Sequence, residues 1–277
     1  MPSPQQHKHK ARKRFGQNFL QDQGIIRHIV ASIRPQPNQG LVEIGPGLGA
    51  ITEFLLAAAG ALDVVELDRD LIPRLRISFA TYGDNLRIHE ADALKFDFTQ
   101  INDQPNSIRI VGNLPYNIST PLIFHLLEYA EQVLDMHFML QKEVVQRMAA
   151  QAGENNYGRL SIMTQYHCQV ENLFEVPPEA FDPRPKVDSA IVRLVPYGEL
   201  PHPADNFKNF ANLVRSAFAQ RRKTLRNNLK GQLTPEQLES IGIDATLRPE
   251  RLTVADYVKI SNYHHQHCQA TTSEKQD

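Results

Sequence analysis

Short apolar runs alternate with helical patterns through the first half of the chain, and this alternation constrains the fold most. Asp22 is placed to cap a helix whose apolar residues share one face, namely Ile25, Ile26, Ile29, Val30 and Ile33. Apolar runs of strand length follow at residues 41–44, 62–66, 86–89, 108–111 and 136–140. Because helical patterns separate these runs, the chain predicts an α/β fold, a mostly parallel sheet with helices on both faces.

Two further apolar runs and a change of composition mark the second half. Runs near 161–170 and 190–195 predict strands that pair antiparallel, and residues 196–203 (PYGELPHP) have the composition of a linker. Beyond the linker only helical patterns occur, and they begin near Phe207, Thr234 and Thr253. We therefore expect a basic arm at 1–21, an α/β domain at 22–197, a small all-α domain at 198–266 and a disordered tail at 267–277.

Composition excludes several classes of protein. The 277 residues suffice for roughly two domains, and the hydrophobic (41%) and charged (22%) fractions exclude whole-chain disorder. Two cysteines exclude a disulfide framework and fit a reducing compartment. Apolar runs stay shorter than the about 18 residues of a membrane span, and no apolar signal core follows the basic N-terminus. We expect a cytoplasmic protein without membrane contact.

Lysine and arginine gather in two blocks, although the net charge of the chain is only −1. Residues 7–14 contain five of them, and no acid precedes Asp22. A second acid-free stretch covers 206–235, part of which we expect to form a basic helix. The candidate RNA-binding residues are Arg12, Lys13, Arg14, Arg221, Arg222, Lys223 and Arg226. Such blocks suit a polyanion that meets one face, and the alternative is a solvated helix face with a frayed terminus.

A glycine-rich turn follows the first predicted strand, in residues 41–49 (LVEIGPGLG). Gly45 and Gly47 let the backbone turn tightly and approach a ligand. Glu66 ends the next strand, 21 residues after Gly45, where a carboxylate can bind a ribose diol at the carboxyl edge of the sheet. Asp92, after the third strand, can reach the adenine amine of the same ligand, although an isolated aspartate more often caps a helix.

Two residues of this turn favour a cationic ligand over a dinucleotide. Pro46 has no amide hydrogen to offer a pyrophosphate, and Glu43 places an anion beside the turn. S-adenosylmethionine (SAM) carries a sulfonium, an ammonium and a ribose but no phosphate, so it suits this loop. The alternatives are a dinucleotide oxidoreductase and a helix-capping loop with a solvated Glu43.

The fourth predicted strand ends in Asn113, Leu114, Pro115 and Tyr116. Because a residue before proline is held extended, Leu114 presents its carbonyl outward beside the side-chain carbonyl of Asn113. Two close acceptors match the two hydrogens of an exocyclic amine, and Tyr116 offers a face on which the base can stack. Phe181, in a proline-stiffened loop, can cover the opposite face of the base. A proline turn with Tyr116 in the core and an ordinary rigid loop at Phe181 are the alternatives.

Six segments occur in the order typical of one family: QNFL at 17–20, EIGPG at 43–47, NLPYNIST at 113–120, YGRL at 157–160, FDPRPKVDSA at 181–190 and QRRKTLRN at 220–227. Over nearly the whole chain the sequence resembles the ribosomal RNA adenine dimethyltransferases, and within them the bacterial small-subunit, KsgA type. The resemblance implies a Rossmann-like class I SAM methyltransferase domain followed by a small helical domain. It also implies dimethylation of two adjacent adenines in a hairpin near the 3' end of 16S rRNA.

The resemblance also assigns roles to single residues. It implies a target-base motif at Asn113, Leu114 and Tyr116, and a stacking aromatic at Phe181. The SAM-contacting positions that it implies are Asn18, Leu20, Gly45, Glu66, Asp92 and Asn113. Residues 152–156 (AGENN) depart from the usual pattern by losing a basic residue, which puts RNA contacts on that loop in doubt.

Other functions remain open at this point. One is a large-subunit rRNA adenine methyltransferase of the antibiotic-resistance type, and another is a ribosome assembly factor whose methylation is incidental. For the main interpretation we expect 16S rRNA within the small subunit as the partner, no obligate protein partner and a monomer. No metal is expected, because no second cysteine pair completes a site with His264, His265, His267 and Cys268.

Overall fold

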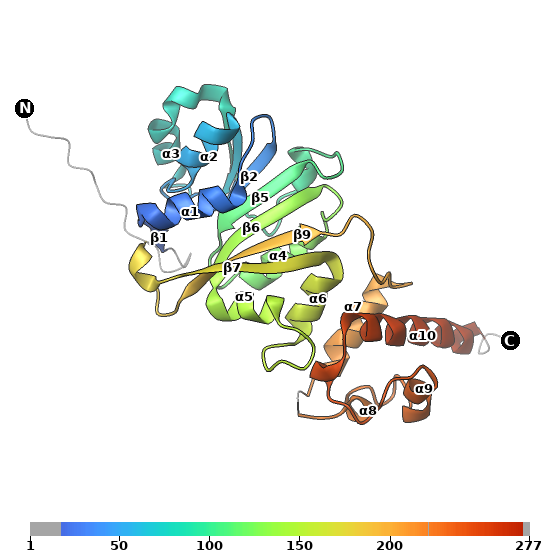
Figure 1. Ribbon diagram of the computed structural model, residues 1–277. Coiled ribbons are helices and arrows are strands. Elements are labelled where there is room, and N and C mark those ends of the chain that lie inside the picture. Colours follow the sequence, from blue (N-terminus) through green and yellow to red (C-terminus); the bar gives the residue numbers. More distant parts are fainter. Residues whose placement is uncertain (1–17, 221, 274–277) are drawn as a thin grey trace, which may run out of the picture. The chain divides into compact units, whose positions relative to one another are not determined.

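The computed structural model describes residues 18–220 and 222–273, and it divides into two compact units (Figure 1). One unit contains the residues up to 142 together with 172–194, and the other contains 143–171 together with the residues from 195 onward. The second unit therefore includes a segment that the sequence groups with the α/β domain, while the expected domain boundaries themselves remain predictions.

A seven-stranded sheet has the order β4-β3-β2-β5-β6-β9-β7. Its strands are β2 (Gly40–Ile44), β3 (Leu62–Glu66), β4 (Leu86–Glu90), β5 (Ile108–Asn113), β6 (Val133–Gln141), β7 (Cys168–Val176) and β9 (Ser189–Pro196). The pairs β2–β3, β2–β5, β3–β4 and β5–β6 are parallel, and β6–β9 is antiparallel. The five strands predicted from the alternating runs are confirmed, and the mostly parallel α/β fold with them.

Helix α1 (Gln23–Ile33) precedes the first strand of the sheet. Helices α2 (Thr52–Ala59), α3 (Ile72–Ser78) and α4 (Ser119–Leu127) connect β2 to β3, β3 to β4 and β5 to β6. The predicted cap of α1 is present, because the Asp22 carboxylate accepts the amides of Gly24 and Ile25 at 2.8 and 2.9 Å. The buried face of α1, with Ile26, Ile29 and Ile33, joins the apolar core of the first unit.

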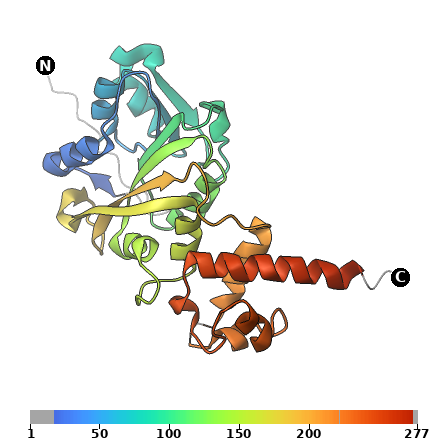
Figure 2. The same cartoon turned by 45° about the vertical axis from the view of Figure 1, so that its right-hand side comes forward.

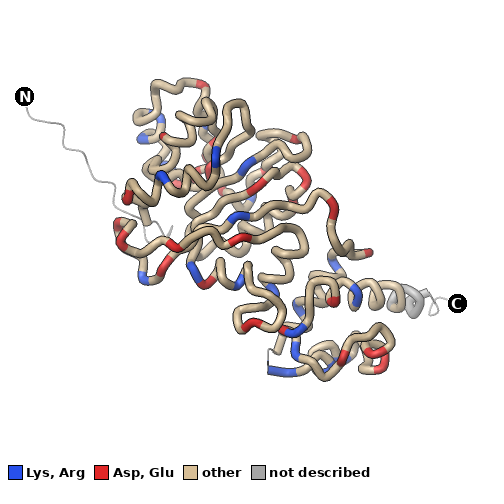
Figure 3. The backbone as a smooth tube through the Cα atoms, in the orientation of Figure 1, with Lys and Arg blue, Asp and Glu red and all other residues tan. Residues whose placement is uncertain are grey.

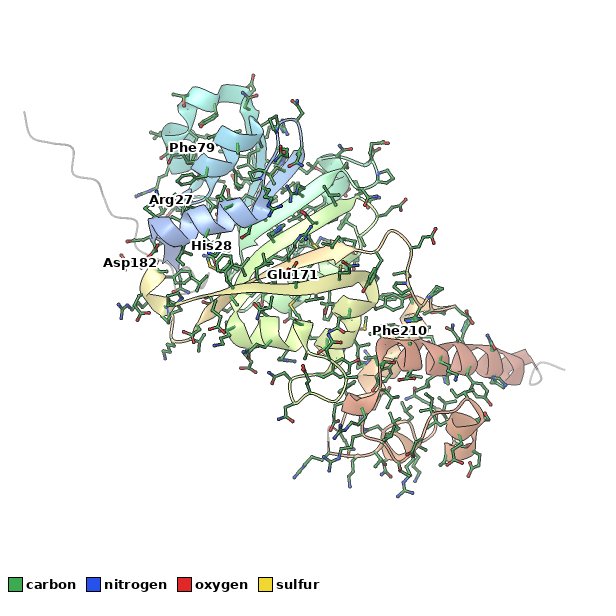
Figure 4. All side chains as sticks on the ribbon, viewed as in Figure 1. Arg27, His28, Phe79, Glu171, Asp182 and Phe210 are labelled. Atoms are coloured by element: carbon green, nitrogen blue, oxygen red, sulfur yellow. The ribbon has the colours of Figure 1, made fainter. Side chains whose placement is uncertain are left out.

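A two-stranded ribbon ties the segment before α1 to a distant loop. Strand β1 (Phe19–Leu20) pairs antiparallel with β8 (Phe181–Asp182), and Leu20 lies opposite Phe181. The labelled Asp182 marks this ribbon in Figure 4. Phe19 and Leu20 of the QNFL segment are therefore held in place by long-range backbone pairing.

The second unit is helical. Its helices are α5 (Lys142–Ala149), α6 (Arg159–His167), α7 (Phe207–Ala217), α8 (Leu225–Asn228), α9 (Pro235–Ser240) and α10 (Val254–Ser273). The predicted capping box of α9 is present, with Thr234 and Gln237 exchanging hydrogen bonds at 2.8 and 3.2 Å. Helix α10, the long red helix of Figure 2, extends to Ser273, so the part of the expected disordered tail up to that residue is helical. Residues 274–277 lie outside the described residues.

Two local predictions are wrong. Residues 161–167 form helix α6, not a strand, and only the run from Cys168 is extended. Ser161 and Thr164 are buried as well as the apolar Leu160, Ile162, Met163 and Tyr166, so no side of the helix is marked by solvent exposure and the sequence shows no clear amphipathic period. The expected basic helix is a loop between α7 and α8, because α7 ends at Ala217 and α8 begins at Leu225.

Within the described residues, no helix combines the length and the apolar character needed to cross a membrane.

Candidate active site

A cavity of about 640 Å³ opens at the carboxyl edge of the parallel strands. The segments that follow β2, β3, β4 and β5 line it, together with residues 18–21. All the described residues that line it belong to the first unit. Its volume is in the range of sites for small ligands, and the carboxyl edge of an open parallel sheet is where such folds bind them.

The glycine turn after β2 has a backbone that only glycine adopts without strain. Gly45, Gly47 and Gly49 have φ angles of 65°, 61° and 87°. A Cβ atom at Gly47 would lie 3.3 Å from the ring of Phe19, and one at Gly49 would lie 2.6 Å from the ring of Phe79, labelled in Figure 4. The turn is therefore packed between two aromatic rings, and its backbone faces the cavity.

Glu43 is buried, with 1% of its surface exposed, and lines the cavity. The hydroxyl of Thr52 donates to its Oε2 at 2.6 Å. Burial raises the pKa of Glu43 to about 8, against the lowering effect of the Thr52 hydrogen bond. A positive charge in the cavity would favour the ionised form, so this carboxyl group is suited to a cationic ligand.

Glu66 ends β3 and is held at the cavity by backbone amides. The amide of Asp68 donates to its Oε1 at 2.7 Å, and the amide of Gly47 also hydrogen-bonds to it. Burial raises the pKa of Glu66, and the amides of Asp68 and Gly47 oppose that shift. The carboxylate is thus fixed beside the glycine turn, as ribose recognition requires.

Asp92 follows β4, and its side chain both stabilises a turn and borders the cavity. Its Oδ1 accepts the amide of Leu94 at 3.0 Å, and its backbone carbonyl accepts the amide of Lys95 at 2.9 Å. The amide of Ala91 donates to the Glu66 carbonyl at 3.1 Å, which ties this turn to the end of β3. The capping role that the sequence offered as an alternative is therefore present together with the position at the cavity.

The described lining of the cavity is rich in acidic side chains and contains no basic one. Four acids, Glu43, Glu53, Glu66 and Asp92, are among its residues, and no Lys or Arg is found among the described residues that line it. A pyrophosphate would be repelled there, whereas a ligand with a sulfonium, an ammonium and a ribose diol matches these acids. The residues present therefore fit SAM and do not fit a dinucleotide.

The Asn113 motif meets the same cavity from the end of β5. The side-chain nitrogen of Asn113 donates to the backbone carbonyl of Asn18 at 3.1 Å. The amide of Leu114 donates to the carbonyl of Met139 at 3.2 Å, and Tyr116 Oη lies 2.8 Å from the hydroxyl of Ser189. Asn113, Leu114 and Tyr116 all line the cavity, as do Asn18, Leu20, Gly45 and Gly47.

Several predicted site residues lie elsewhere. Phe181 is buried in the apolar core opposite Leu20, and it is absent from the described residues that line the cavity. Arg222, Lys223 and Arg226 belong to the second unit. Arg221 and the arm with Arg12, Lys13 and Arg14 lie outside the described residues. Within the described part of the chain, no group of three or more His, Cys, Asp or Glu residues comes together as a metal site.

Two residues of the site were not predicted. Thr52 holds Glu43, and Ser189 contacts Tyr116. Thr52 lies nine residues after Glu43, at the start of the helix that follows the glycine turn. That position in the sequence could have indicated a hydrogen bond from Thr52 to Glu43. Ser189 belongs to the 181–190 segment, but its partner lies 73 residues away and no local pattern links the two.

The family model described as ribosomal RNA adenine dimethylase matches residues 8–266. The chain belongs to this family. A ribosomal RNA small subunit methyltransferase A of Marinomonas sp. is 61% identical over 255 residues, covering 92% of this chain and 96% of the relative. The protein of the same name from Marinobacter nauticus is 64% identical over 257 residues, covering 92% of each chain.

Solved structures agree with this family. A dimethyladenosine transferase from Plasmodium falciparum superposes with a TM-score of 0.76 at 29% identity, covering 87% of this chain and 95% of that one. The 23S rRNA methyltransferase ErmE superposes with a TM-score of 0.70 at 23% identity, covering 90% of this chain and 100% of that one. At that identity the second likeness concerns the fold alone.

Proposed function

We propose that this protein transfers methyl groups from SAM to the exocyclic amines of two adjacent adenines, in a hairpin near the 3' end of 16S rRNA. The observation that carries the reaction type is an acidic cavity, without lysine or arginine among its described lining residues, bordered by Asn113, Leu114 and Tyr116. The small-subunit names of the relatives that are 61% and 64% identical support the choice of rRNA.

The residues that would hold SAM differ in what they recognise. Glu66 would bind the ribose diol, Asp92 would accept from the adenine amine, and the buried Glu43 would balance positive charge. The glycine backbone at Gly45 and Gly47 leaves room for close approach. Bound SAM supplies an electrophilic methyl group carried on a sulfonium.

The amine of the target base is a poor nucleophile, because its lone pair is delocalised into the ring. The Asn113 side-chain oxygen and the Leu114 carbonyl would accept its two hydrogens and favour a pyramidal nitrogen. Burial raises the pKa of Tyr116, so the phenol stays neutral and offers a stacking face rather than a base. No strong general base is required, since the proton can leave after transfer.

The target adenine has to leave its stack in the hairpin to reach this cavity. The basic residues of the second unit, among them Arg222, Lys223 and Arg226, would hold the RNA by its phosphates. We propose that the protein acts as a monomer, without an obligate protein partner, on small subunits in the cytoplasm. The stacking role of Phe181 stays part of this proposal, and it requires the buried ring to become accessible when RNA binds.

The test is methyl transfer from labelled SAM to purified ribosomal subunits that lack the modification. We expect label in 16S rRNA of small subunits, as dimethyladenosine, and none in large subunits. The matched control is Glu66→Ala, which should lose about tenfold or more in SAM affinity, because a hydrogen bond to a charged group is worth about 1.5–3 kcal/mol. Label in large subunits would favour the antibiotic-resistance type instead.

A variant that binds small subunits without methylating them would separate catalysis from ribosome assembly. Expression of a variant that binds small subunits but does not methylate them should leave subunits immature if methylation, or the release that follows it, matters. Normal maturation with the inactive variant would favour an assembly factor whose methylation is incidental.

A further inference from the structure

The phenol of Tyr116 is held by a buried serine from another strand. Tyr116 Oη lies 2.8 Å from Oγ of Ser189, which has 0% of its surface exposed. Ser189 is the first residue of β9 and pairs with Gln141 of β6. The carbonyl of the preceding residue, Asp188, accepts the amide of Lys142 at 3.0 Å. The serine hydroxyl is thus attached to the sheet and forms a fixed point.

Tyr116 itself lies in the irregular segment between β5 and α4. Its carbonyl accepts the hydroxyl of Ser119 at 3.2 Å, and the amide of Ile118 donates to the carbonyl of Pro115 at 3.1 Å. These bonds fix the backbone but not the rotation of the side chain about its own bonds. The half-buried ring borders the cavity, so its orientation depends on the contact between its hydroxyl and Ser189.

We propose that Ser189 is a positioning residue, which orients the Tyr116 ring to stack on the target adenine. The proposal rests on the function proposed above. A ring that is already oriented loses less conformational freedom when the base arrives, so the hydrogen bond contributes to capture of the base. Ser189 is absent from the described residues that line the cavity, and its effect therefore passes through Tyr116.

Ser189→Ala and Tyr116→Phe each remove one hydroxyl and keep the ring. In steady-state methylation of small subunits that lack the modification, we expect each variant to raise KM for subunits about two- to tenfold, the loss of one neutral hydrogen bond, with kcat within about twofold. The double variant should have a KM no higher than that of the more impaired single variant, because both changes remove the same bond.

Ser32→Ala is the matched control, since the Ser32 hydroxyl donates to the carbonyl of His28 at 2.9 Å within α1 and does not border the cavity. Its KM should stay at the wild-type value. Thermal unfolding and SAM calorimetry check that each variant is folded and binds SAM.

A folded Ser189→Ala with wild-type KM, or losses that multiply in the double variant, would overturn the proposal. If Ser189→Ala does not fold, Tyr116→Phe still tests the proposal, because a wild-type KM for Tyr116→Phe would also overturn it. Failure of the unmodified protein to methylate small subunits would instead contradict the proposed function.

Discussion

The side-chain nitrogen of Asn113 donates to the backbone carbonyl of Asn18, which lies 95 residues earlier in the chain. Because the side-chain nitrogen of Asn113 is bonded to Asn18, the residue before β1, its side-chain oxygen is the atom that can accept a hydrogen bond from a substrate. The same segment pairs as β1 with β8. The orientation of the acceptor therefore depends on a piece of chain that is far away in sequence.

Asn113→Ala should act mainly on the methyl-transfer step. The change removes one of two acceptors that align the amine, and a preorganised contact of this kind can be worth on the order of 10²–10³ in rate. The measurement is single-turnover methylation at saturating SAM and saturating small subunits, with SAM affinity measured separately by calorimetry. A wild-type rate under these conditions would mean that Asn113 is only a cofactor contact.

Glu43 should make SAM binding dependent on pH. Its pKa is raised to about 8 by burial, so at neutral pH the free protein holds a proton there. A cation in the cavity favours the ionised form, and binding should therefore release that proton and tighten as the pH rises from about 6 to about 8. Above about 8 the affinity should level off.

Calorimetry of SAM binding near pH 6.5, in buffers of different ionisation heat, measures the released proton. Glu43→Gln is the matched control, because it keeps an oxygen for the Thr52 hydroxyl and cannot titrate. We expect the wild type to release close to one proton more than this variant. Equal proton release in the two proteins would rule out Glu43 as the linked group.

Arg109 should be required for the stability of the first unit. It is 7% exposed, and its Nε and Nη2 donate to the two oxygens of Asp135, each at 2.8 Å. It also donates to the carbonyls of Ile33 and Arg34 at 2.6 and 3.1 Å, at the end of α1. Arg109→Met leaves the buried carboxylate without its main partner and should lower the free energy of unfolding by about 3–5 kcal/mol.

Urea unfolding followed by circular dichroism checks this value. Lys142→Met is the control, because Lys142 pairs with Glu175 at the surface and its removal should change little. Arg109→Met combined with Asp135→Leu should recover much of the loss, since an apolar replacement of a buried pair is often tolerated. If the double variant is as unstable as the single one, the bonds to the α1 carbonyls are the larger contribution.

The sheet could be predicted because its strands repeat one local pattern, an apolar run followed by a helical period. The cavity could be predicted in outline for the same reason. Glu66 and Asn113 end strands of one parallel sheet, and Gly45 and Asp92 follow strands of it, so the four must meet at its carboxyl edge. These inferences need only the succession of strands and helices along the chain and the edge of the sheet at which each strand ends.

The features that the sequence could not show depend on long-range packing. Helix α6 is buried on all sides, so its sequence has no helical period, and its neighbours in space decide its structure. Phe181 pairs with Leu20 through β8 and β1, and this pairing over some 160 positions buries the ring that the motif suggested for stacking. The contact of Tyr116 with Ser189 is likewise invisible in sequence.

A side chain and a backbone amide hold described residues of the basic loop between α7 and α8. The side-chain nitrogen of Asn228 donates to the carbonyls of Gln220 and Lys223 at 3.2 and 3.3 Å, and the backbone amide of Lys223 donates to the Gln220 carbonyl at 2.9 Å. Arg222 and Lys223 are exposed there, and blue segments mark this part of the chain in Figure 3. The exposed cations of Arg222 and Lys223 are suited to phosphate contacts, as the predicted basic helix would have been.

Reversing Arg222 and Lys223 to Glu should weaken binding to small subunits and flatten its salt dependence. Each lost phosphate contact lowers the slope of log K against log salt by about 0.7–0.9. SAM affinity should not change, because every described residue that lines the cavity belongs to the first unit. The charge-matched control reverses Arg27 and Arg76, which are exposed on α1 and α3. If both double variants lose the same slope, the effect is one of net charge, and if the loop variant keeps the wild-type slope, the loop is only a solvated surface.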